Sequence, residues 1–453
     1  MQQLTLFDCL YPQFKITKPV RLIECFAGYG SQALALKYMG IEFEHWKICE
    51  WAINSIQAYK DIHFFNDVTD YSLSLSFLEI INYLENKGIS KDYSNPMQRK
   101  EIERLGENKC RKIYNNIIST HNLVNITQVK GKDLNIVDTN KFQYILTYSF
   151  PCQDLSLAGL QKGMTKGSET RSGLLWEVER ILDELSLDNI ELPILLMENV
   201  PQIHSQQNIA DFKKWLLKLE KLGYTNFCED VNSKNYGIPQ NRVRTFCLSI
   251  PRKEIAYNFL PKIKLKKYLF DLLEPNVDEK YFLSKKQIKD IINWDAYQKP
   301  FETMEKLVDS SIAPTITTRS GAYTAGMILV PIKCNNSKQF KIATIWDGID
   351  VSSRMKYHRG TVQNGLIQTL TTQCNVGTIT DKSKIRKLTP REFFRLMGVK
   401  DEDFEKVKTH QAESSLYHLA GDSIVTTSLI AVLGNLFKNI NLNEILLAIQ
   451  KDI

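Results

Sequence analysis

The sequence of 453 residues lacks several features that would define its class at once. Its nine cysteines include no Cys-x-x-Cys pair, and its seven histidines show no metal-ligand spacing, which argues against a zinc ribbon. No apolar run approaches the ~20 residues of a membrane helix, and the N-terminus does not resemble a secretory signal. An odd number of scattered cysteines favours reduced thiols. We therefore expect a cytoplasmic protein that binds no metal and no membrane.

Composition places the chain among ordinary globular proteins. Hydrophobic residues make up 43% and charged residues 24% of the sequence, and the length allows two or three domains. The net charge of +7 is a mild excess, compatible with a polyanionic partner. Most of the lysines are expected to be solvated surface residues.

The first segment has the pattern that opens a nucleotide-binding sheet. Residues 20–27 read as a buried strand, Gly28 and Gly30 mark a tight turn, and a helix follows as far as Gly40. Glycines at this turn let the backbone approach a ligand closely, and the helix N-terminus favours an anionic group. A plain tight turn without a ligand is the alternative reading.

A second predicted strand, 43–49, ends at Glu50 and Trp51. An acidic residue at this position typically binds a ribose hydroxyl in such folds. Trp51 is compatible with stacking on an adenine and equally with packing against the next helix.

Three later strands each deliver a chemically useful residue. The strand 142–148 leads to Cys152, the apolar strand 193–197 ends at Glu198, and Arg242 and Arg244 precede the strand 245–250. Cys152 alone could be a small buried hydrophobe or a reactive thiol. A carboxylate that ends a buried strand costs free energy unless it has a partner or a function. Strands alternate with helices throughout, which predicts an α/β fold with a doubly wound, mostly parallel sheet.

The composition and pattern of the sequence change twice, which suggests three segments. Residues 18–250 would form the α/β domain, with a helical insertion at about 71–124 and then a short strand, 123–129. Residues 251–385 are Lys- and Pro-rich and then rich in short β segments, which predicts a smaller, irregular β-rich domain. The α/β pattern resumes at 386–453, so this segment is expected to pack back onto the first domain.

The motifs stand in an order that resembles the DNA (cytosine-5)-methyltransferases of bacteria and phages. The matching residues are Phe26-x-Gly28-x-Gly30, Glu50-Trp51, Pro151-Cys152-Gln153, Glu198-Asn199-Val200, Gln240-x-Arg242-x-Arg244, Arg386-Lys-Leu-Thr-Pro-Arg391-Glu392 and Gly421-Asp422-Ser423. The resemblance implies a Rossmann-like methyltransferase domain that uses S-adenosylmethionine, and it makes 251–385 a target-recognition domain.

The resemblance also implies a mechanism. The thiolate of Cys152 adds to C6 of a cytosine flipped out of duplex DNA, which makes C5 nucleophilic toward the methyl group. Glu198 then contacts N3 and the amino group of the base, and Arg244 contacts O2. The segment from Gln153 to Arg171 would act as a lid over the DNA.

The same resemblance assigns residues to the two binding sites. For the cofactor these are Phe26, Gly28, Gly30, Glu50, Trp51, Asp133, Leu174, Asp422 and Ser423, with Asp67 as the alternative to Asp133 for the adenine amino group. For DNA they are Gln153, Ser156, Arg171, Arg242 and Thr369. We expect a monomer that acts on double-stranded DNA, with a cognate restriction endonuclease as a separately acting partner.

Two other functions remain open at this stage. A tRNA cytosine-5 methyltransferase would share the catalytic motifs, although the large 251–385 region argues against it. A catalytically silent, sequence-specific DNA-binding regulator would need no catalytic residues, yet Cys152, Glu198 and Arg244 are all present.

Overall fold

A six-stranded sheet forms the centre of the larger region of the computed structural model, which describes residues 11–151, 155, 163, 171–293, 330–335, 339–352, 362–380 and 384–452. The strand order is β2-β1-β3-β4-β7-β5. The pairings β1–β2, β1–β3 and β3–β4 are parallel. The strands are β1 (Val20–Cys25), β2 (Phe43–Cys49), β3 (Gln143–Tyr148), β4 (Ile194–Asn199), β5 (Thr225–Asn232) and β7 (Val243–Ile250).

Helices cover both faces of this sheet, which is why β1 and β4 are buried along their whole length. One hydrophobic core joins the sheet to α2, α15 and α16, and a second joins it to α7 and α8. The predicted doubly wound, mostly parallel sheet is confirmed. The helices are α2 (Ser31–Tyr38), α3 (Ile53–His63), α7 (Leu175–Leu187), α8 (Ile209–Lys221), α15 (Thr426–Leu433) and α16 (Leu442–Lys451).

The sheet ends in two antiparallel pairings that the alternating pattern did not predict. β7 lies between β4 and β5 and runs antiparallel to both. β5 has no clear signature in the sequence, because this edge strand is largely solvent-accessible and carries polar residues such as Glu229 and Asp230. Without a continuous apolar run or a clean alternation, the periodicity of a buried strand is missing.

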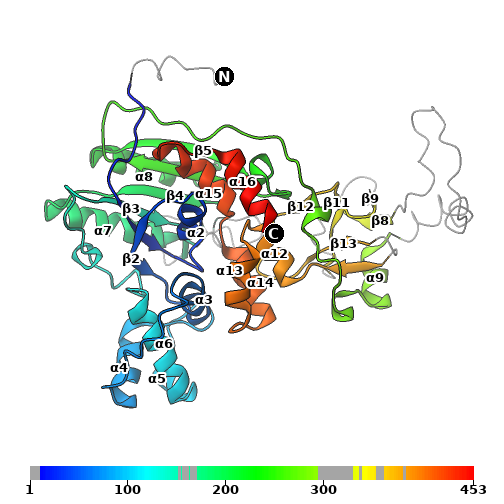
Figure 1. The fold of residues 1–453 in the computed structure, drawn as a ribbon, viewed down its shortest axis with the longest axis horizontal. Coiled ribbons are helices and arrows are strands. Elements are labelled where there is room, and N and C mark those ends of the chain that lie inside the picture. Colours follow the sequence, from blue (N-terminus) through cyan, green and yellow to red (C-terminus); the bar gives the residue numbers. More distant parts are fainter. Residues whose placement is uncertain are drawn as a thin grey trace, which may run out of the picture.

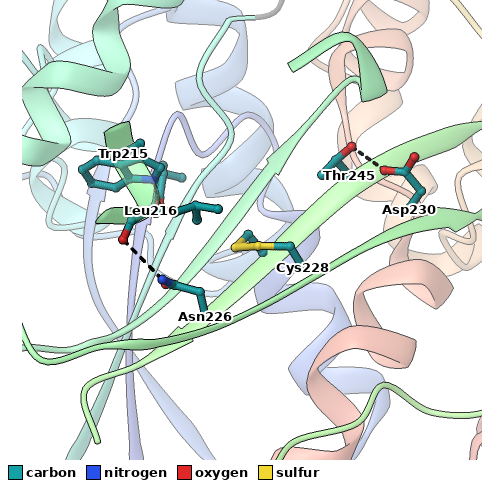
Figure 2. Close-up of a disulfide and its surroundings, with 8 residues drawn as sticks. Trp215, Leu216, Asn226, Cys228, Asp230 and Thr245 are labelled. Carbon is teal, nitrogen blue, oxygen red and sulfur yellow. Dashed lines mark hydrogen bonds between the residues drawn. A yellow bond between two sulfur atoms is a disulfide. The ribbon is translucent and has the colours of Figure 1, made fainter. Parts of the chain in front are cut away.

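The β5–β7 ladder also contains a disulfide, which contradicts the expectation that all thiols are reduced. Cys228 and Cys247 lie directly opposite each other, with their Cα atoms 4.0 Å apart, and their sulfur atoms are bonded. Figure 2 shows this bond in the sheet, near Trp215 and Asn226. A count of cysteines could not reveal the pair, because β5 was not recognised as the neighbour of β7.

A second prediction, a strand at 123–129, is wrong. Only Asn122 makes a bridge, with Ile48 of β2. The Asn122 side chain accepts a hydrogen bond from the Glu50 N–H and donates one to the Glu50 carbonyl, at 3.1 and 2.8 Å. The Asn122 side chain thus pairs with the Glu50 backbone as a neighbouring strand would. Val124 then turns the chain away from β2 with a φ of 71°.

The insertion folds as a small helical unit at the lower left of Figure 1. Its apolar residues form a core of their own together with Ile53 and Ile56 of α3. The helices are α4 (Phe77–Lys87), α5 (Arg99–Arg104) and α6 (Glu107–Ser119).

The smaller region lies at the right of Figure 1 and is built from short strands. Its four-stranded sheet has the order β11-β10-β13-β14, and β8 pairs with β9. One strand of this region, β12, runs parallel to β6 of the larger region, which joins the two. The elements are β6 (Gln240–Asn241), α9 (Lys285–Ile291), β8 (Val330–Lys333), β9 (Phe340–Ala343), β10 (Gly348–Asp350), β11 (Val362–Gln363), β12 (Ile367–Gln368), β13 (Val376–Ile379) and β14 (Ile385–Lys387).

The last segment returns to the larger region through α12 (Pro390–Leu396), α13 (Asp401–Lys408) and α14 (Glu413–Asp422). Thr389 caps α12, and its side chain accepts a hydrogen bond from the Glu392 N–H. The Glu392 carboxylate, fully buried, holds the Arg386 guanidinium through two hydrogen bonds of 2.8 and 2.6 Å. This ion pair fixes the junction between β14 and α12.

Residues Glu413–Leu436 are long and apolar enough to cross a membrane by length and composition alone. However, 89% of its apolar 18-residue window is buried inside the protein. It therefore has the character of core helices, and α15 indeed contributes five consecutive residues, 429–433, to the core under the sheet.

Candidate active site

A cavity of about 390 Å³ opens at the C-terminal ends of β1, β2, β3 and β4. In open α/β sheets, ligands bind at this edge. The cavity runs without interruption from Glu50 and Trp51 at one end to Glu198 and Arg244 at the other. Seven of the nine residues predicted for the cofactor line it: Phe26, Gly28, Glu50, Trp51, Leu174, Asp422 and Ser423.

The glycine turn supports one wall of the cavity. Gly28 has a φ of 56° and its N–H donates to Glu50 Oε2 at 2.9 Å. Gly30 does not line the cavity. A Cβ on Gly30 would lie 2.3 Å from the His63 ring, so this glycine is required by packing behind the turn.

Glu50 is a buried carboxyl whose pKa is shifted. Its other oxygen accepts a hydrogen bond from the Ala52 N–H at 2.8 Å, and the side chain is buried. Burial raises the pKa of this carboxyl to about 7, although the backbone donors of Ala52, Gly28 and Trp51 oppose the shift. Hydroxyl donors of a ligand would favour its ionised form.

Trp51 has a position compatible with either of its two predicted roles. It lines the cavity and also packs partly against the core of the insertion. Leu174, at the end of a short helical turn before α7, likewise lines the cavity while packing against the second core.

At the opposite end, Glu198 and Arg244 face each other. Arg244 Nε lies 3.2 Å from Glu198 Oε1, and both side chains are largely buried. Burial raises the pKa of Glu198, and the nearby Arg244 and Arg242 guanidinium groups oppose that shift. The end of β4 and the start of β7 place these two side chains, because the strands are antiparallel neighbours.

Pro151 brings the chain to the edge of the cavity. Its carbonyl accepts a hydrogen bond from Ser172 Oγ at 2.7 Å, and Asn199 Nδ2 donates to the Phe150 carbonyl at 3.0 Å. Cys152 is the next residue, but it lies outside the described residues. Two bonds from neighbouring segments therefore fix the chain where the predicted nucleophile follows.

Of the residues predicted to contact DNA, Gln153 and Ser156 lie outside the described residues, as does the side chain of Arg171. Thr369 directly follows β12, and its hydroxyl donates to the Asn241 carbonyl at 3.0 Å. It thus lies beside the strand that leads to Arg244.

Arg242 is a buried residue that links three segments of the chain through hydrogen bonds. It is only 2% exposed and donates to the carbonyls of Leu370, Gly421 and Ser423, at 3.1, 3.1 and 2.6 Å. These carbonyls come from the smaller region and from the C-terminal segment. Direct contact of this guanidinium with DNA phosphates is not supported by that burial.

Neither aspartate predicted for the adenine amino group lines the cavity. Asp133 lies in a short helical turn and accepts a hydrogen bond from the Lys130 N–H. Asp67 caps the following turn through the Thr69 N–H and the Tyr71 hydroxyl. Among the residues between Asp67 and Asp133, Val124, Ile126 and Thr127 line the cavity.

Several lining residues were not predicted from the sequence. They are Ser31 and Gln32 at the start of α2, Tyr93 and Ser94 from the insertion, and His418 from α14. Ser31 and Gln32 follow the glycine turn directly, which could have indicated them. Tyr93 is a single aromatic residue in the polar run SKDYSNP, and no periodicity indicates where such a residue lies.

His418 and Asp422 are one helical turn apart on α14, with His418 Nδ1 and Asp422 Oδ2 at 3.3 Å. Desolvation raises the pKa of Asp422, and His418 opposes the shift. Among the described residues, no group of three His, Cys, Asp or Glu side chains could hold a metal ion. The donors present suit an organic ligand with hydroxyl, amino and cationic groups.

Comparison with known proteins places the chain in one family. The family model described as C-5 cytosine-specific DNA methylase matches residues 75–438. The type II methyltransferase M2.ScrFI of Lactococcus lactis subsp. cremoris is 32% identical over 421 residues, covering 93% of this chain and 99% of the relative. The orphan methyltransferase M.SssI of Spiroplasma monobiae is 40% identical over 275 residues, covering 59% and 68%.

Among solved structures, that of the S. pombe Dnmt2 methyltransferase is similar, with a TM-score of 0.48 and 17% identity, covering 92% of this chain and 97% of that chain. The family match extends over most of the sequence and includes the ends of β3 and β4, and the full-length relative M2.ScrFI matches 93% of the chain. The chain therefore belongs to the C-5 cytosine-specific DNA methylases and is a DNA (cytosine-5)-methyltransferase.

Proposed function

We propose that the protein transfers the methyl group of S-adenosylmethionine to C5 of a cytosine flipped out of double-stranded DNA, through a covalent bond between Cys152 and C6. The observation that carries this proposal is the single cavity, which joins the Glu50 end to the Glu198–Arg244 end. A methyl donor and an acceptor base must share one enclosed space for direct transfer, because water would otherwise compete.

The residues of the chain fit the donor. Glu50 accepts ribose hydroxyl groups, and Trp51 offers a face for the adenine. Asp422, at the opposite wall, suits the cationic amino-acid end. When bound, S-adenosylmethionine supplies an activated methyl group on a sulfonium centre.

The Glu198–Arg244 pair fits the acceptor base. Addition of the Cys152 thiolate to C6 forms an S–C bond and pushes electron density toward N3 and O2. A protonated Glu198 can donate to N3, and the raised pKa of this buried carboxyl favours that state. Arg244 stabilises the charge on O2. After methyl transfer, the C5 proton leaves, the S–C bond breaks and 5-methylcytosine is released.

The smaller region is proposed to read the DNA sequence, with Thr369 beside the flipped base. Residues 153–171 are proposed as a lid, with Lys162, Lys166 and Arg171 meeting phosphates. A restriction endonuclease that cuts the same sequence is the proposed biological partner.

The test is expression in a methylation-deficient host, followed by sequencing that detects 5-methylcytosine in DNA and in tRNA. We expect a discrete methylated DNA motif that disappears with Cys152→Ala and persists with Cys374→Ala, a free cysteine that does not line the cavity. Methylation that survives Cys152→Ala would refute the nucleophile. Methylated tRNA with unmodified DNA would favour the RNA enzyme.

A second experiment examines the covalent step itself. DNA with 5-fluorocytosine at the methylated position should trap the protein, because fluorine cannot leave as a cation. The adduct should require the methyl donor for its stable, methylated form and should be absent with Cys152→Ala. Glu198→Gln should slow its formation by about two orders of magnitude.

A further inference from the structure

The helical insertion contributes directly to the wall of the active-site cavity. Its residues 90–96, called the 90–96 loop below, connect α4 to α5, and Tyr93 and Ser94 of this loop line the cavity. The core of α4, α5 and α6 includes neither Tyr93 nor Ser94, although it contacts the cavity wall through Val124 and Trp51. The approach of the loop to the site therefore requires a separate explanation.

Hydrogen bonds hold the 90–96 loop against the segment that follows β2. The Ser90 N–H donates to the Trp51 carbonyl at 2.8 Å, and the Ile53 N–H donates to the Ser90 carbonyl at 2.9 Å. Within the loop, Asp92 Oδ1 accepts from the N–H groups of Ser94 and Asn95, at 2.8 and 3.0 Å. The loop thus has a defined shape directly beside Glu50 and Trp51.

Tyr93 connects the insertion to α14, which also lines the cavity. Its ring stacks on the His418 ring, with centroids 4.2 Å apart and an interplanar angle of 16°. Its hydroxyl lies 3.3 Å from Ser55 Oγ. The backbone of Tyr93 has a φ of 62°, an unfavourable value for an aromatic residue, which points to a functional constraint at this position.

The position of Tyr93 relative to the two carboxylates defines what it would touch. Glu50 and Asp422 both act electrostatically on the Tyr93 hydroxyl, and burial raises the pKa of that hydroxyl. Tyr93 therefore shares the cavity wall with the group suited to a ribose and the group suited to the amino-acid end of the donor. A ligand that reaches from one carboxylate to the other passes along this ring.

We infer that Tyr93 is a cofactor-contacting residue and that the 90–96 loop is a cover that retains S-adenosylmethionine. This inference rests on the proposed function of the cavity and extends it to the insertion. The cover has to separate from α14 for the nucleoside to enter or leave, and that separation breaks the stack of Tyr93 on His418. The insertion thereby controls how long the cofactor stays bound.

The experiment measures binding of S-adenosylhomocysteine to the full chain by calorimetry and its dissociation rate by stopped flow, without DNA. Tyr93→Ala should weaken binding by about tenfold, the order of an aromatic stacking contact, mainly through faster dissociation. Tyr93→Phe keeps the ring and should bind like the wild type. In turnover, KM for the cofactor should rise while KM for DNA stays constant.

Tyr114→Ala is the matched control. Tyr114 lies in the same insertion, packs edge-to-face on Tyr83 and does not line the cavity, so its loss should lower the thermal midpoint without changing affinity. Equal affinity of Tyr93→Ala and wild type would overturn the inference while leaving the proposed function intact. Equal weakening by Tyr93→Ala and Tyr114→Ala would also overturn it, as a general destabilisation. Failure of the wild type to bind S-adenosylhomocysteine would overturn both proposals.

Discussion

Replacing Glu392 by Gln should loosen the junction between β14 and α12. Each Glu392 oxygen accepts two hydrogen bonds: Oε2 from Arg386 Nη1 and the Thr389 N–H, Oε1 from Arg386 Nη2 and the Glu274 N–H, all at 2.6–2.8 Å. The amide of Gln presents donor hydrogens to one of these pairs of donors. The variant also leaves the Arg386 charge buried without its counter-ion, since that side chain is only 3% exposed.

Removing one partner of a buried ion pair typically costs about 3 kcal/mol or more. Local opening of α12 should therefore become roughly two orders of magnitude more frequent. Hydrogen exchange with mass spectrometry should show this as a loss of amide protection in α12, without a need for two-state unfolding of the whole chain.

Glu402→Gln is the control for this experiment, because Glu402 is exposed on the neighbouring α13, and its exchange should match the wild type. Adding Arg386→Met to Glu392→Gln should recover part of the loss, since the buried charge is then gone. Unchanged protection of α12 in Glu392→Gln would refute the reasoning, and so would a double variant that is less protected than the single one.

Three further predictions follow from the site and the sheet. Affinity for S-adenosylhomocysteine should rise as the pH increases through about 7, because the raised pKa keeps Glu50 protonated below that value in the free protein, while the hydroxyl donors of the ligand favour the carboxylate. Glu50→Gln should flatten this part of the pH profile. A pH profile that the substitution leaves unchanged would contradict this prediction. Thiol titration of protein denatured without reductant should find two fewer thiols than the nine cysteines of the sequence, owing to the Cys228–Cys247 bond, and all nine would disprove the bond. Gly421→Ala should weaken both DNA and cofactor binding, because the added Cβ would lie 2.3 Å from the Thr371 backbone and push α14 away from the smaller region. Normal affinities for both ligands would contradict this prediction.

Most of the cavity residues that the sequence predicted lie at or next to strand ends, whereas Leu174, Asp422 and Ser423 lie at helix ends. Glu198 and Arg244 lie at the ends of the apolar strands β4 and β7, and such runs are readable because burial on both faces leaves a continuous hydrophobic signal. Glu50 follows the more polar strand β2 and was predicted from its distance to the glycine turn. The alternation of strands and helices gave the doubly wound sheet for the same reason.

The missed parts lack that signal. β5 is a partly exposed edge strand, so its pairing with β7 and the disulfide between them were not foreseeable. Asn122 pairs with Glu50 through its side-chain amide, a contact between distant residues that leaves no periodic trace. Tyr93 approaches the cavity through the tertiary placement of the insertion, which local sequence does not encode.

Burial of Arg242 has a consequence for how specificity can change in this protein. Its guanidinium joins the strand before β7, the carbonyl of Leu370 and the carbonyls of Gly421 and Ser423. Under the proposed role of the smaller region in reading DNA, a version transplanted from a relative would thus succeed only if it presents a carbonyl where Leu370 does. Exchange of the smaller region as a unit is therefore limited by the hydrogen bond between Arg242 and the Leu370 carbonyl. Variation in DNA sequence preference should concentrate in segments far from this contact.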